Sequence, residues 1–100
     1  MAKRLKSEAT FSPFMPVREV IHKEESLKCL VFYLKPGQRI DLHRSPRRVL
    51  VIVLEGEGEF FVGSTDKRER LRKGELIIYE PEEPHGFQAI EDMVVMALVV

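Results

Sequence analysis

Two stretches of the chain carry the side chains whose types could do chemistry. The first, Gly37–Gly56, holds His43 and a cluster of basic residues, namely Arg44, Arg47 and Arg48. The second, Tyr79–Phe87, holds His85 directly after a proline. The three arginines could clamp a carboxylate or phosphate, or they could form a solvated rim. The two histidines could serve a binding site, or they could simply hydrogen-bond to water or a carboxylate.

The elements that must position these residues are short strands. No window keeps an apolar period of 3.6 over three turns, so we expect almost no helix. About nine short strands separated by Gly and Pro turns predict an all-β sandwich or barrel. We expect a flexible N-terminal arm over residues 1–12 and a single domain over residues 13–100. The predicted strands are 17–22, 27–34, 39–44, 49–54, 59–62, 67–71, 76–79, 85–89 and 93–99.

The strand that carries His43 shows an alternating pattern. Because successive side chains of a strand point to opposite faces, Asp41 and His43 should share one face. Ile40 and Leu42 should then lie on the other face. We therefore predict that Asp41 is available beside His43.

Composition and charge exclude several classes of function. The 100 residues, 44% hydrophobic and 32% charged, suffice for one folded domain. The formal net charge is zero, so no global field draws the chain to nucleic acid or to an anionic membrane. The basic run Lys67–Lys73 follows Glu55, Glu57 and Glu59, which predicts an ion-paired hairpin surface. We expect neither a nucleic-acid partner nor a membrane partner.

Cysteine usage and the longest apolar run bear on the cellular compartment. Cys29 is the single cysteine, which excludes an internal disulfide and fits a reducing compartment. It lies within an apolar strand, where a thiol is expected to be part of the core. The run Met93–Val100 is far shorter than the roughly 20 residues of a membrane helix. The basic start is not followed by the apolar core of a signal peptide, so we expect a cytoplasmic protein.

The spacing of certain residues resembles the two motifs of the cupin superfamily. The first motif is matched by Gly37, His43, Ser45, Val49 and Gly56, in that spacing. The second is similar to Gly74, Pro81 and the run Pro84–Phe87, and Val53–Phe60 is typical of the cupin turn between the motifs. The resemblance implies a small single-domain jelly roll, the double-stranded β-helix.

The resemblance also implies where a metal would be held, and the chain departs from that pattern. His43 and His85 match family ligands, but Ser45 stands in place of the second histidine and Val49 in place of the glutamate. A carboxylate from Asp41 or Glu83 could complete a set of two histidines and one carboxylate. The cofactor is therefore either one divalent transition metal (Fe, Mn, Ni, Cu or Zn) or none. The second motif departs too, since Glu82 replaces a usual glycine and Ala89 a usual asparagine.

Three functions follow from this degenerate site, and the sequence leaves open whether the chain is an enzyme. The first is a binding protein that holds a small polar or anionic molecule in the mouth of the barrel. The second is a metal-dependent enzyme, of dioxygenase or isomerase type, using His43, His85 and a carboxylate. The third is a structural or partner-binding protein with a vestigial pocket. The residues expected around the pocket, besides the histidines, are Ser45, Arg47, Val49, Tyr79 and Phe87.

Two predicted strands are apolar on both faces. In a lone small barrel one face of residues 27–34 and of residues 93–99 would meet water. Large exposed apolar patches usually mark interfaces. We therefore expect a homodimer that uses these two strands.

Overall fold

The computed structural model describes residues 2–4 and 11–100, and this part of the chain forms nine strands and no helix. The predicted all-β fold is confirmed. Most of the arm predicted over residues 1–12 lies outside the described residues. No helix in the described part is long and apolar enough to cross a membrane. The strands are β1 (Val17–Lys23), β2 (Lys28–Leu34), β3 (Arg39–His43), β4 (Val49–Glu55), β5 (Glu57–Val62), β6 (Arg68–Arg72), β7 (Leu76–Tyr79), β8 (His85–Ala89) and β9 (Met93–Val99).

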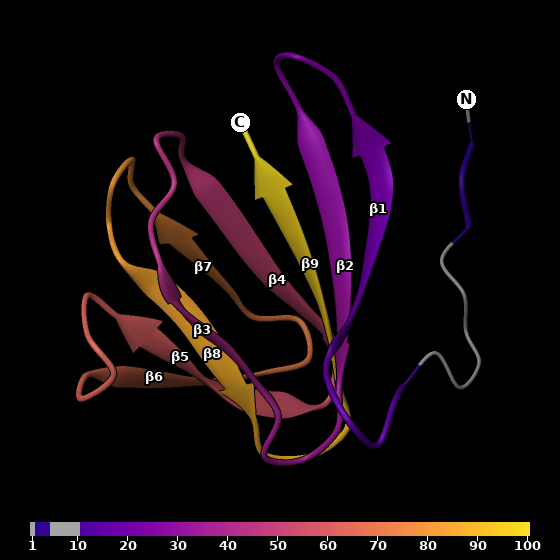
Figure 1. The fold of residues 1–100 in the computed structure, drawn as a ribbon, viewed down its shortest axis with the longest axis vertical. Coiled ribbons are helices and arrows are strands. Elements are labelled where there is room, and N and C mark those ends of the chain that lie inside the picture. The colour runs from indigo at the N-terminus through magenta and orange to yellow at the C-terminus, as the bar shows by residue number, and fades with distance from the viewer. Residues whose placement is uncertain (1, 5–10) are drawn as a thin grey trace.

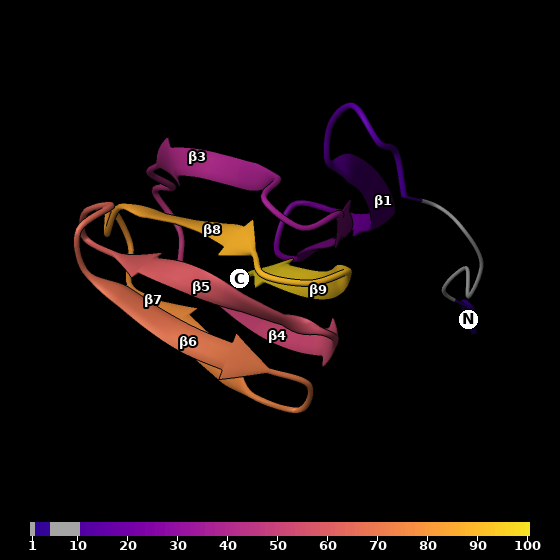
Figure 2. The ribbon, with the colours of Figure 1, turned by 90° about the horizontal axis from the view of Figure 1, so that it is seen from below.

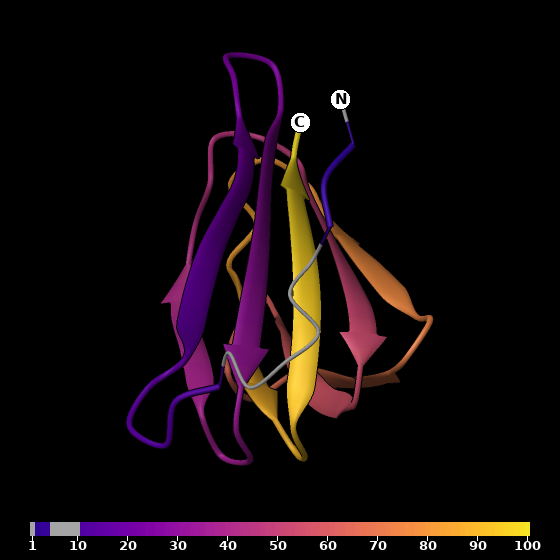
Figure 3. The same cartoon turned by 90° about the vertical axis from the view of Figure 1, so that its right-hand side faces the viewer.

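The strands form two antiparallel sheets that face each other (Figures 1 and 2). One sheet has five strands in the order β1-β2-β9-β4-β7, and its outer face is seen in Figure 3. The other has four strands in the order β3-β8-β5-β6. Strands distant in sequence are neighbours in both sheets, as expected for a jelly roll.

The core lies between the sheets and follows from the period of two in each strand. In β4, Val49, Val51 and Val53 point inward and are at most 4% exposed, while the residues between them are only half-buried. Full burial of each valine contributes about 1.5–3 kcal/mol. β2 is buried on both faces, as its apolar pattern predicts: Val31, on its outer face, is 0% exposed.

The predicted alternation in β3 is wrong because the strand contains a β-bulge. Ile40 pairs with Phe87 and His43 pairs with His85, and the register shifts between these two pairs. The extra residue rotates the strand, as bulges do, so that Ile40 and His43 both point into the space between the sheets. Asp41 points outward, with a side chain that is 87% exposed.

Gly86 allows the bulged strand to approach β8. A Cβ atom at this position would lie 2.5 Å from the carbonyl oxygen of Ile40 and 3.0 Å from the Phe61 ring. No side chain fits at that distance, and the first neighbour is backbone that cannot rotate away. Glycine at position 86 is therefore required for the close pairing of β3 with β8.

The loop between β7 and β8 is held against the connection between β3 and β4. The backbone N–H of Glu82 donates to the carbonyl oxygen of Ser45 at 2.7 Å. Glu82 takes a φ of 67°, the left-handed region that favours glycine. The resemblance to the second cupin motif implies glycine at this position, and the left-handed φ is a physical reason for it. The bond keeps the segment that leads into His85 beside Ser45.

Candidate functional site

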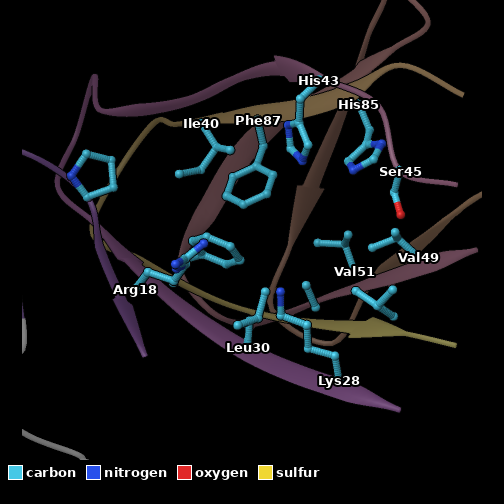
Figure 4. Close-up of a pocket in the computed structure, with 14 residues that line it drawn as sticks. Arg18, Lys28, Leu30, Ile40, His43, Ser45, Val49, Val51, His85 and Phe87 are labelled. Atoms are coloured by element: carbon cyan, nitrogen blue, oxygen red, sulfur yellow. The ribbon is translucent and has the colours of Figure 1, made fainter. Parts of the chain in front are cut away.

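His43 and His85 are direct cross-strand partners on β3 and β8. Their ring centroids lie 4.2 Å apart with the planes at 60°. His43 Nδ1 lies 2.8 Å from the carbonyl oxygen of Asp41, and His85 Nδ1 lies 2.9 Å from that of Glu83. Because a carbonyl only accepts, each Nδ1 is the donor, which leaves Nε2 as the lone-pair nitrogen of the neutral ring. Both rings point into the cavity (Figure 4).

The surroundings of His85 favour its neutral form. The residue is 5% exposed and stacks on Tyr79 with ring centroids 4.8 Å apart. Burial lowers the pKa of His85, and the neighbouring His43 lowers it further, against the opposing effect of the bond to the Glu83 carbonyl. At neutral pH this imidazole therefore offers an acceptor at Nε2.

The histidines form part of the wall of a cavity of about 420 Å³ between the two sheets (Figure 4). This volume is typical of a small-molecule site. Most of the wall is apolar: Pro16, Leu30, Phe32, Ile40, Val49, Val51, Phe87, Ala97 and Val99. The polar residues of the wall are Arg18, Lys28, His43, Ser45 and His85.

Three of the five residues expected around the pocket line this cavity, namely Ser45, Val49 and Phe87. Tyr79 and Arg47 do not. Tyr79 lies behind His85, where its hydroxyl donates to the carbonyl oxygen of Phe61 at 2.8 Å and burial raises its pKa. Arg47 Nη2 donates to the carbonyl oxygen of Val99 at 3.4 Å. Both therefore support the wall from outside.

The carboxylates predicted to complete a metal site point elsewhere. Asp41 Oδ1 pairs with Arg39 Nε at 3.0 Å. Glu83 Oε1 accepts from the backbone N–H of Glu80 at 2.9 Å. Among the described residues, no group of three or more His, Cys, Asp or Glu side chains is placed to hold a metal ion. The side chains of the described residues thus do not fit the metal that the family pattern implies.

The remaining charged clusters are surface ion pairs. Arg48 donates to both carboxylate oxygens of Glu80, at 2.8 and 3.2 Å. Arg44 is exposed and does not line the cavity. The ion-paired hairpin predicted at the basic run is confirmed, since Arg70 pairs with Glu57 and Arg68 with Glu59. Cys29 is buried as expected, and burial raises its pKa.

Sequence reasoning missed the two charged cavity residues, Arg18 on β1 and Lys28 on β2. The signal was present in the alternation of β2, where Lys28 shares the inward face with Leu30 and Phe32. Arg18 is the register partner of Phe32 and so points to the same side.

The fold agrees with the comparisons to known proteins. The family model described as a cupin domain matches residues 30–100. The chain therefore belongs to the cupin family. No curated protein matches it.

Several solved structures are similar to the chain over most or all of its length. An RmlC-like cupin from Desulfovibrio desulfuricans is 30% identical, with a TM-score of 0.91, covering 100% of this chain and 95% of its own. A conserved protein of unknown function from Streptococcus pyogenes is 26% identical, with a TM-score of 0.85, covering 100% and 88%. An uncharacterized protein with a double-stranded β-helix domain from Klebsiella pneumoniae is 26% identical, with a TM-score of 0.81, covering 89% and 79%.

Proposed function

We propose that this cupin is a binding protein that holds a small polar or anionic molecule in the cavity between its sheets, without a resident metal. The observation that supports this most is the chemistry of the wall. His43, His85 and Ser45 converge on one cavity, and no third metal-binding side chain of the described residues joins the histidines. Apolar walls with a few convergent polar groups are the usual composition of a small-molecule site.

The two histidines would bind the ligand through hydrogen bonds. Each Nδ1 is held by a backbone carbonyl, at 2.8 Å for His43 and 2.9 Å for His85. Such bonds fix the tautomer and the orientation of a ring. The Nε2 atoms of neutral rings accept hydrogen bonds from a ligand, and a protonated His43 would donate one instead. The Ser45 hydroxyl can do either.

Thermal unfolding in a metal-free, chelator-containing buffer tests the proposal. A panel of small neutral, polar and anionic molecules is added to the wild type and to His43→Ala and His85→Ala. A ligand present at about 100 times its Kd stabilises the folded state by about 2.7 kcal/mol, which raises Tm by several degrees. We expect at least one compound to raise the Tm of the wild type and to lose its effect in both variants.

His22→Ala is the matched control, because His22 is the third histidine and pairs with Glu24 outside the cavity. It should keep the ligand-dependent rise in Tm. A panel without any stabilising compound would contradict the binding function. Stabilisation that appears only when the chelator is left out and a divalent metal is added would favour the metal-dependent enzyme instead.

A further inference from the structure

We propose that Arg18 and Lys28 form an anion-binding subsite, and that the ligand is a monocarboxylate with an apolar body. This inference rests on the proposed function and names its ligand class. The two cations come from β1 and β2 of the five-stranded sheet, whereas the histidines come from the four-stranded sheet. Figure 4 shows both cationic side chains extending into the space that the histidine rings face. A ligand between the sheets therefore meets both sets of polar groups.

The carboxylates of Glu19 and Asp41 do not neutralise these two cations. Glu19 follows Arg18 on β1 but lies on the opposite face, where it accepts a hydrogen bond from the Tyr33 hydroxyl at 3.3 Å. Asp41 pairs with Arg39 on the outside of β3. Neither Arg18 nor Lys28 forms an ion pair with any residue in the described part of the chain.

The register places Lys28 inside the site. Lys28 pairs with Val99 on β9, and Val99 pairs with Val49 on β4. These three side chains form one row on the inner face, and all of them line the cavity. The side chains of Val49 and Val99 are short, so they leave space in the cavity for the long side chain of Lys28. The cavity wall contains two permanent cations and no carboxylate, and such a wall has a positive potential that attracts an anion.

The apolar part of the cavity wall indicates that the ligand has an apolar group in addition to its anionic group. Phe32 and Phe87 meet edge to face with ring centroids 5.5 Å apart, and Leu30, Ile40 and Val51 lie around them. Burying apolar surface against this wall is favourable, whereas burying a second charge there is costly. Few further donors are available for a multiply charged phosphate. A single carboxylate joined to an aromatic or branched apolar group fits both parts of the site.

Isothermal titration calorimetry at low salt in a metal-free, chelator-containing buffer tests the subsite. The probe is phenylacetate, compared with the neutral isostere phenylacetamide, with acetate, which lacks the apolar body, and with inorganic phosphate. Charge-assisted hydrogen bonds are the strong ones, so each lost cation should weaken binding about tenfold. We expect phenylacetate to bind the wild type at least about tenfold more tightly than the other three probes.

The variants are Arg18→Gln and Lys28→Gln, with Arg18→Lys as a charge-conserving variant that should recover part of the affinity. Lys23→Gln is the matched control, because Lys23 is the register partner of Lys28 but does not line the cavity. We expect phenylacetate binding to weaken about tenfold in each Gln variant and to stay within about twofold in the control. Affinity for phenylacetamide should be the same in all of them.

The outcomes separate this inference from the function on which it rests. Equal binding of phenylacetate and phenylacetamide, or Gln variants that match the wild type, would overturn the subsite. Tighter binding of phosphate would overturn the ligand class. If neutral molecules stabilise the protein in the thermal panel while phenylacetate does not bind, the binding function stands and the subsite fails. If nothing in either experiment binds, both fail.

Discussion

At the scale of single residues, the site depends on two imidazoles held by their own strands. Each ring donates through Nδ1 to a carbonyl two residues earlier, at 2.8 Å for His43 and 2.9 Å for His85. This local bond needs no partner from elsewhere in the fold. The two rings differ in burial, because His43 is exposed at the mouth and His85 is buried against Tyr79. Because His85 is buried, its protonation affects folding.

Stability should fall at acid pH because of His85. Burial lowers its folded-state pKa below the usual value of about 6.5. Between the two pKa values the unfolded chain binds a proton that the folded chain does not, so stability drops as pH falls through 6.5 toward the folded pKa. Urea unfolding from pH 7.5 to 5 measures this dependence. His85→Gln should be less stable at pH 7.5 and show a flatter dependence; equal slopes would contradict the prediction.

Glu82 should be a strained position. Its φ of 67° disfavours any residue with a Cβ atom, by roughly 1–2 kcal/mol. Glycine relieves that strain but adds freedom to the unfolded chain, so we expect Glu82→Gly to raise the free energy of unfolding by up to about 1 kcal/mol. Glu82→Ala keeps the Cβ atom and should give no such gain. A Gly variant no more stable than the Ala variant in urea unfolding would show that the position is not strained.

At the scale of elements, the positions of the strands could be predicted and the geometry of β3 could not. Apolar runs bounded by Gly and Pro predicted all nine strands, and the resemblance to the cupin motifs implied that His43 and His85 meet. The alternation of polar and apolar residues in β3 does not reveal the bulge, which is visible only in the pairing of β3 with β8. For this reason the alternation alone assigned Asp41 to the wrong face. Arg18 and Lys28 were missed because charges near strand ends usually face water, and only the register shows that they point inward.

The close approach of β3 to β8 should depend on Gly86. A Cβ atom there would overlap the backbone of Ile40 at 2.5 Å, so Gly86→Ala should cost about 2–3 kcal/mol. It should also weaken ligand binding, since it pushes His43 away from His85. Gly74→Ala is the control: nothing lies within 4 Å of its Cβ position, and only its φ of +89° opposes alanine. Urea midpoints compare the two; an equal or smaller loss at Gly86 would argue against the overlap.

At the scale of the whole molecule, the outer face of the five-stranded sheet carries exposed apolar side chains. The predicted homodimer through residues 27–34 and 93–99 stays a prediction, although the outer face of residues 27–34 is already buried within one chain. Val31 and Tyr33 of β2 are at most 2% exposed within one chain. Leu76 and Ile78 of β7 are 51% and 49% exposed on the same outer face. A second copy would therefore cover β9, β4 and β7 rather than β2.

Sedimentation equilibrium at micromolar concentration measures this association. We expect twice the chain mass of 11.6 kDa for the wild type. Ile78→Glu should give the single-chain mass, because a carboxylate buried in an apolar interface is costly. Leu42→Glu changes an exposed leucine on the other sheet and should remain a dimer. A wild type of single-chain mass would end the homodimer hypothesis.

Elemental analysis tests most directly the central claim that the cavity holds no resident metal. Protein without a tag is purified with neither added metal nor chelator, and the wild type is compared with His43→Ala, His85→Ala and the control His22→Ala. Two histidines without a third ligand should hold any divalent metal weakly. We predict iron, manganese, nickel, copper and zinc well below one equivalent, with no dependence on the substitutions. Close to one equivalent of one metal, retained in the control and lost in both cavity variants, would contradict the proposed function and establish a metal centre.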